Sequence, residues 1–146
     1  MYEKPLVTSH ALTAFNVANT TEVRSIPRVP GKRYCRILDI HTLATTAAIV
    51  ATTSAPVLNF GDGTTAAKFA AQRVCPATAG LAVGSSYNLR DYDGRVAAYA
   101  TSGNGFIDWD SDGNAGAALT ALVVTPVAGV GTGTGRYDAN VVIEWW

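Results

Sequence analysis

Short apolar runs separated by turn residues occupy most of this 146-residue chain. Many of the runs are rich in Val, Ile, Thr and aromatic residues, which favour β-strands. Asp-Gly steps lie between the runs at Asp62-Gly63, Asp93-Gly94 and Asp112-Gly113. Asp-Gly suits a two-residue hairpin turn because Asp tolerates positive φ and Gly adopts it freely. The pattern therefore predicts an all-β fold of short antiparallel strands.

The spacing of about eight or nine such strands is typical of an antiparallel two-sheet sandwich, jelly-roll-like in architecture. The strands are expected at residues 36–43, 48–52, 57–60, 86–89, 96–100, 106–110, 117–127 and 137–145. The segment Ala66–Val74 contains good helix formers. It predicts a short helix across one end of the sandwich.

The first 33 residues differ from the rest because they hold Pro5, Pro27 and Pro30 and few sustained apolar runs. Proline removes a donor from the strand ladder and is confined to sheet edges and bulges. We therefore predict that residues 1–33 form an extended N-terminal arm or edge strand, and that residues 34–146 form the sandwich domain.

Charge is scarce and balanced. Only 15% of residues are charged, and 11 basic residues offset 11 acidic ones. This balance provides no basic stripe for nucleic acid. The chain start carries no signal-peptide pattern, and the apolar stretch Leu119–Val130 is too short to span a membrane. We expect cytoplasmic synthesis, no nucleic-acid or membrane partner, and a tendency to self-associate.

Catalytic chemistry finds little support in the sequence. Cys35 and His41 would share a face of one strand but lie roughly 20 Å apart, too far for a nucleophile and its base. His10 falls in the predicted arm, and the run Gly129–Gly135 lacks the spacing of a phosphate-binding loop. Cys35 and Cys75 are expected to be buried, inert thiols. We predict no enzymatic activity and no cofactor.

One motif resembles the opening of a calcium loop. Asp108, Asp110 and Asp112 alternate, and Gly113 occupies the sixth position. The twelfth position is Leu119, so the bidentate carboxylate is missing. The competing interpretation is a strand that ends in a hairpin turn. We favour the turn and expect no tight calcium site.

Two clusters indicate binding surfaces. The first is a basic cluster of five residues: Arg24, Arg28, Lys32, Arg33 and Arg36. It is typical either of a solvated edge that discourages strand addition or of a surface that docks on an acidic protein. The second is the C-terminal pair Trp145 and Trp146. These two side chains point to opposite faces of a strand, so one can join the core while the other anchors a subunit contact.

The layout of several strands resembles a known family. The stretch Arg36–Gly63, with the strands Ala117–Val124 and Val141–Ile143, is similar to the small β-sandwich virion proteins of tailed bacteriophages. These include the decoration (cement) proteins of capsid shells, which are often trimers. The resemblance implies a virion protein on the capsid surface that binds the major capsid protein and forms a homo-oligomer, expected to be a trimer. The basic cluster would then contact the capsid, and the terminal tryptophans a neighbouring copy.

The alternative is a receptor- or carbohydrate-binding module of a phage fibre or spike. Aromatic residues in or beside the predicted rim segments would stack on sugar rings; they are Tyr87, Tyr92, Tyr99, Trp109 and Tyr137. A sugar site needs a shallow groove that combines exposed aromatics with planar polar groups. A cement protein needs a flat, extended footprint instead.

Overall fold

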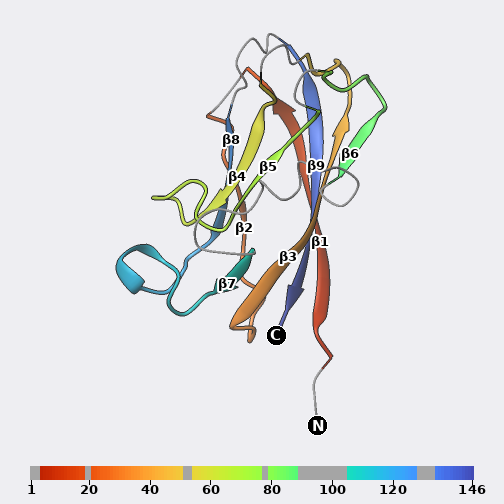
Figure 1. Cartoon of the computed structure of the whole chain (residues 1–146). Helices are drawn as coiled ribbons and strands as arrows, with labels where there is room; N and C mark the ends of the chain where they lie inside the picture. Colours follow the sequence, from red (N-terminus) through yellow and green to blue (C-terminus); the bar gives the residue numbers. More distant parts are fainter. Residues whose placement is uncertain (1–3, 19–20, 51–53, 77–78, 89–104, 128–133) are drawn as a thin grey trace.

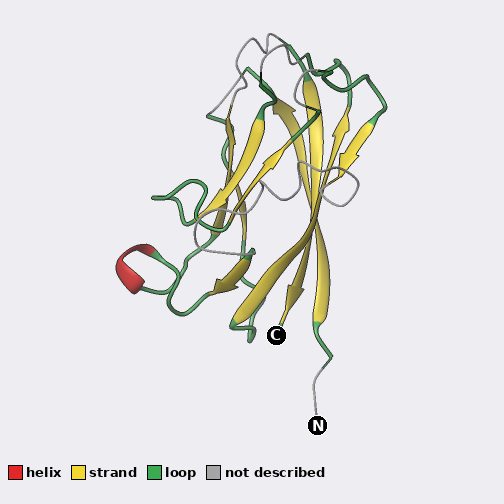
Figure 2. Cartoon of the chain, in the orientation of Figure 1, coloured by secondary structure: helices red, strands yellow, loops and turns green. Residues whose placement is uncertain are grey.

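The computed structural model describes residues 4–18, 21–50, 54–76, 79–88, 105–127 and 134–146. These residues form two antiparallel sheets (Figures 1 and 2). The first sheet has the order β1 (Leu6–Asn16), β9 (Arg136–Trp145), β3 (Tyr34–Ala44) and β6 (Ser86–Asn88), and β7 (Phe106–Asp108) also pairs with β3. The second sheet has the order β2 (Arg24–Ile26), β8 (Leu122–Val127), β4 (Val57–Gly61) and β5 (Ala70–Arg73).

This strand order defines the fold. With β7 set aside, β1-β9-β3-β6 and β2-β8-β4-β5 reproduce the two sheets of a jelly roll, in which the chain passes repeatedly from one sheet to the other. The described helical structure is one 3₁₀ turn at Asn114–Gly116. The predicted all-β, two-sheet sandwich is therefore confirmed.

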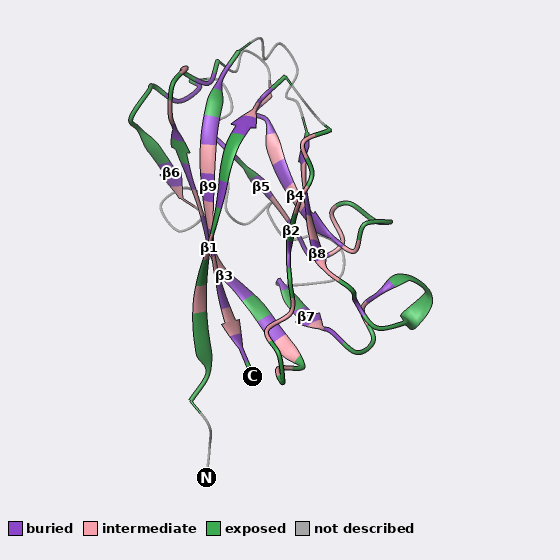
Figure 3. Cartoon of the chain, turned by 180° about the vertical axis from the view of Figure 1, so that it is seen from behind, coloured by how far each residue is buried: buried purple, intermediate pink, exposed green. Residues whose placement is uncertain are grey.

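Strict alternation along β9 explains how the core forms. Every second residue is buried, from Tyr137 through Val141 to Trp145, and the residues between them face outward. This is the two-residue period of a strand with one buried face. Figure 3 shows buried positions in the strands of both sheets, with less buried positions between them. Side chains from the second sheet complete the core; among them are Ile26, Leu58, Phe60, Leu122 and Val124.

A β-bulge in β3 reverses the face of the residues that follow it. The register with β9 shifts between Ile37 and Asp39, so one extra residue is accommodated there. Cys35 is buried before the bulge and Ile40 after it, whereas His41 is only half-buried. The prediction that Cys35 and His41 share a face is therefore wrong.

The N-terminal region contributes an edge strand to each sheet. β1 pairs with β9 alone and β2 with β8 alone. Leu12, Phe15 and Ile26 are buried in the same core as the central strands. Over residues 6–16 and 24–26 the chain is thus an integral edge of the sandwich, not a free arm.

The helix expected at Ala66–Val74 is not formed. The segment contains β5, which pairs with β4 from Phe60↔Ala70 to Val57↔Arg73. Ala70 and Gln72 are buried, and Ala71 between them is half-buried. Pairing and burial thus override the helix propensity of this alanine-rich segment.

The two Asp-Gly steps within the described residues do not form two-residue turns. Asp62-Gly63 lies in the loop between β4 and β5, where Asp62 Oδ1 accepts hydrogen bonds from the amides of Thr64 and Thr65 at 2.8 and 2.6 Å. Asp112-Gly113 lies between β7 and β8, which belong to different sheets, so the hairpin predicted there is wrong.

Several other predicted strands have different bounds in the structure or lie outside the described residues. The strand expected at 48–52 appears only as a bridge between Ile49 and Leu81 over its described residues. The strand expected at 117–127 starts at Leu122. Asp93-Gly94, the strand expected at 96–100 and residues 129–133 of the glycine run lie outside the described residues.

Candidate binding surfaces

Three aromatic side chains gather where β9 ends, beside the starts of β3 and β7 (Figure 1). Tyr34, Phe106 and Trp146 have ring centroids 5.7 to 6.2 Å apart. Phe106 and Trp146 are each 41% exposed. The amide of Trp146 donates to the carbonyl of Tyr34 at 3.0 Å, and the reverse bond measures 2.9 Å. We call these three residues the aromatic patch.

The two terminal tryptophans have separate roles. Trp145 is fully buried and its ring stacks on that of Trp109 at 5.6 Å. Its Nε1 donates to Thr8 Oγ1 at 2.7 Å. Trp145 is therefore a core residue and offers no surface for the subunit contact predicted for it. Trp146 is the exposed member of the pair, as expected from the alternation of the strand.

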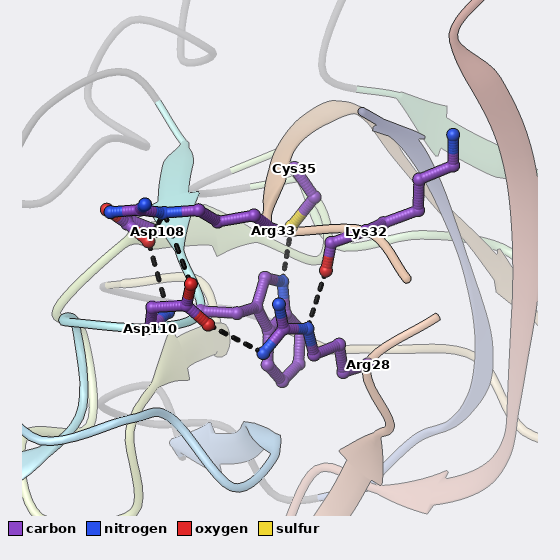
Figure 4. Close-up of polar contacts among 7 residues, drawn as sticks. Arg28, Lys32, Arg33, Cys35, Asp108 and Asp110 are labelled. Atoms are coloured by element: carbon purple, nitrogen blue, oxygen red, sulfur yellow. Dashed lines mark hydrogen bonds and ion pairs between the residues drawn. The ribbon is translucent and has the colours of Figure 1, made fainter. Parts of the chain in front are cut away.

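Charged residues next to Tyr34 of the aromatic patch form the ion pairs shown in Figure 4. Arg33 donates from both Nε and Nη2 to the Asp108 carboxylate, at 3.1 and 3.0 Å. Its guanidinium carbon also lies 5.0 Å from the centre of the Tyr34 ring. Asp110 joins Arg33 to Arg28, with N–O distances of 3.3 and 2.8 Å. The arrangement fixes charges of both signs beside exposed aromatic rings.

Hydrogen bonds from Arg33 hold the pKa of Asp108 down at about 2, and the same pairing raises the pKa of Arg33. Asp108 therefore stays ionised at neutral pH and Arg33 stays protonated. The border of the aromatic patch carries balanced charge at any physiological pH.

The basic cluster predicted as a capsid contact is divided and partly neutralised. Arg28 and Arg33 pair with Asp110 and Asp108. Arg24 lies elsewhere, with its guanidinium carbon 5.0 Å from the centre of the Phe15 ring. The Lys32 side chain points away from the Arg28–Asp110 pair (Figure 4). No single basic surface results among these residues, and their role in a capsid contact stays a prediction.

The carboxylates of the calcium-like motif are directed to other partners. Asp108 and Asp110 pair with arginines, and Asp112 Oδ2 accepts the Asp108 amide at 2.7 Å. Over the described ranges, no group of three or more His, Cys, Asp or Glu side chains is placed to hold a metal ion. The motif instead shapes the start of the connection from β7 to β8.

Both cysteines are buried and unpaired, as the sequence predicted. Burial raises the pKa of the Cys35 thiol to about 11 and that of Cys75 to about 11. The thiolate is the nucleophilic form. Both groups are therefore protonated and unreactive at neutral pH.

Three of the five aromatics predicted to stack on sugars lie in the core. Tyr87 is 3% exposed, and Trp109 and Tyr137 are fully buried. Tyr92 and Tyr99 lie outside the described residues. Tyr87, Trp109 and Tyr137 cannot stack on a sugar at the surface because they are buried in the core.

A shallow hollow of about 390 Å³ lies on the outer face of the first sheet, across β1, β9 and β3. Its walls are Ala11, Thr13, His41, Leu43, Asp138, Ala139 and Asn140. No sequence pattern described above predicted this hollow. The polar residues Asp138 and Asn140, at alternate positions of the last strand, could have indicated a polar site on one face of that strand.

The part of the chain that the structure describes contains no helix long and apolar enough to cross a membrane.

No family model matches the chain, and no curated protein sequence matches it. The chain is similar to a solved structure described as "Cyanophage Pam1 capsid asymmetric unit", with 14% sequence identity and a TM-score of 0.45. The alignment covers 96% of this chain and 85% of that one. A similarity at this level assigns no function, so the proposals that follow rest on the geometry of the chain itself.

Proposed function

We propose that this chain is a non-enzymatic structural protein of a bacteriophage particle, a decoration protein that binds and stabilises the head shell. The aromatic patch is the observation that carries the proposal. Aromatic residues and arginine are enriched at the centres of protein interfaces, with polar residues around them. Phe106 and Trp146 supply the exposed rings, and Arg33 with Asp108 supplies the polar border.

The placement of nucleophiles and bases supports a non-enzymatic role. The Cys35 thiol points into the core and His41 points out of it, on opposite faces of β3. His10 Nε2 lies 2.8 Å from Thr8 Oγ1, but that oxygen also accepts the Trp145 indole. Thr8 and His10 are therefore part of the packing around a core tryptophan. A catalytic nucleophile needs a base that a third group orients for proton transfer, and we assign no such role to this pair.

The aromatic patch suits a protein partner of mixed surface chemistry. Its border holds Arg33 with Asp108, and Arg36 with Glu144 at 3.2 Å. With the charges already paired, the free energy of binding comes from burying the rings, so binding should depend only weakly on salt. We assign this surface to the shell. Homotrimer formation stays a prediction. If a trimer forms through the aromatic patch, Trp146 contacts a neighbouring copy instead of the shell.

Co-sedimentation with particles that lack the protein tests the proposal. Trp146→Ala should weaken shell binding roughly 30-fold, which is the loss of about 2 kcal/mol expected for a central interface tryptophan. Val127→Ala is the matched control, since Val127 is 40% exposed in β8 of the other sheet. This variant should bind as the parent does.

Sedimentation velocity of the same variants without particles separates the two contacts. If Trp146→Ala dissociates an oligomer and leaves shell binding intact, the patch joins copies of the chain and our assignment to the shell is wrong. If Trp146→Ala changes neither property, the patch is no interface and the proposal loses its support.

A further inference from the structure

The hollow on the first sheet is crossed by a row of outward-facing side chains. The strand registers place Ala11 opposite Asn140, Asn140 opposite His41, and His41 opposite Asn88. Such directly opposed residues have Cβ atoms about 5 Å apart. Along β9, Asp138 lies two residues from Asn140 on the same face. The polar groups around the hollow therefore converge from three strands.

Two nitrogen atoms beside this hollow have N–H groups without a hydrogen-bond partner among the residues that the structure describes. Ser9 Oγ donates to Asn140 Oδ1 at 2.8 Å, so the two N–H groups of Asn140 Nδ2 have no partner among the described residues. Asn88 Nδ2 lies 3.0 Å from His41 Nδ1. Because an amide nitrogen only donates, Nδ1 accepts, and the proton of the neutral imidazole is on Nε2. That Nε2–H likewise has no partner within the described ranges.

The acceptor of the hollow is Asp138. One of its oxygens accepts the amide of Ala14 at 2.8 Å, and the carboxylate has further acceptor capacity. Ala14 has φ +61°, an uncommon conformation for alanine, next to the bulge of β1 between Leu12 and Phe15. Bulges and strained residues of this kind recur beside binding sites.

The remaining walls are apolar, mainly the side chains of Ala11 and Leu43. A volume of about 390 Å³ falls within the range of small-ligand sites, which combine apolar walls with a few convergent polar groups. Lys and Arg are absent from the seven lining residues, and Asp138 repels anions. The ligand that fits is neutral, has one apolar face, and carries adjacent groups that both donate and accept hydrogen bonds.

We propose that this hollow binds one ring of a neutral saccharide. Neighbouring hydroxyls accept from Asn140 Nδ2 and His41 Nε2 and donate to Asp138, because each hydroxyl can do both. The C–H face of the ring packs on Ala11 and Leu43. The site is separate from the aromatic patch, since Tyr34 and His41 are seven positions, roughly 20 Å of strand, apart along β3.

Titration of the isotope-labelled full chain, followed by amide NMR shifts, tests the inference. The probes are glucose, galactose, mannose and N-acetylglucosamine, with glucuronate as the acidic control. At least one neutral sugar should give saturable shifts around the hollow in the millimolar range, and glucuronate should bind at least several-fold more weakly. Asn140→Ala should weaken binding about tenfold, the loss of one good hydrogen bond.

Asn59→Ala is the matched control, because Asn59 is a half-buried asparagine in β4 of the second sheet. It should leave sugar binding unchanged, as should Trp146→Ala, so this inference and the proposed shell contact can fail independently. The inference is wrong if no neutral sugar gives saturable shifts, if glucuronate binds as well, or if Asn140→Ala binds like the parent.

Discussion

Replacing each terminal tryptophan in turn gives a sharp test of the structure. Trp145 is fully buried, stacks on Trp109 and donates a hydrogen bond to Thr8. A buried tryptophan replaced by alanine costs about 3–5 kcal/mol of unfolding free energy. For a domain of this size, that loss lowers the melting temperature by roughly 10–15 °C. Trp146 is 41% exposed, so Trp146→Ala should cost less than about 1 kcal/mol.

Urea unfolding followed by circular dichroism measures both variants without relying on tryptophan fluorescence. Trp145→Phe keeps a ring against Trp109 but loses the indole donor and part of the buried ring volume, so it should cost about 2–3 kcal/mol, less than Trp145→Ala. It remains informative if Trp145→Ala fails to fold. Equal destabilisation by Trp145→Ala and Trp146→Ala would refute the reasoning, because it would mean that the two indoles contribute equally to the folded state.

Four further predictions concern the loop between β4 and β5 and the thiols. Gly61→Ala should cost at least about 2 kcal/mol in urea unfolding, since a Cβ on Gly61 would collide with the backbone carbonyl oxygen of Thr65 in that loop; a neutral result would contradict the loop geometry. Lys68→Met should cost about 1–3 kcal/mol, because it removes the ammonium group 3.0 Å from the Asp62 carboxylate, which is 3% exposed and keeps its backbone hydrogen bonds from Thr64 and Thr65. Backbone hydrogen bonds in the loop, and Lys68, lower the pKa of Asp62. Its stabilisation is therefore complete above the unfolded pKa of about 4 and is lost as pH falls through the lowered folded value. Asp62→Asn should flatten that acid dependence of the melting temperature. Cys35 and Cys75, both buried, should resist a thiol reagent in the native protein and react fully in denaturant; fast native labelling would argue against their burial.

The features predictable from the sequence are those set by local periodicity. The apolar residues over 137–145 predicted a strand, and β9 is that strand, with every second residue buried. The same two-residue period predicted that Trp145 and Trp146 point to opposite faces, and one is buried while the other is exposed. The number of short apolar runs and the placement of turns were sufficient for a two-sheet sandwich, since such a chain has few other ways to bury its strands.

The features that escaped prediction depend on contacts between distant residues. The alanine-rich β5 is a strand because β4 is beside it. The bulge in β3, which turns His41 outward, is a matter of register with β9, about 100 residues away. Arg33 looked like a free basic residue because its partner Asp108 is 75 positions distant. The hollow combines side chains from β1, β3 and β9, and no local pattern brings those strands together.

The decoration role is tested most directly by electron microscopy of purified particles with and without this protein. We expect extra density on the outer surface of the head shell in particles that contain the protein, and its loss in particles made with Trp146→Ala. Density confined to the tail, neck or fibres, or particles that lack the protein altogether, would contradict a role in decorating the shell.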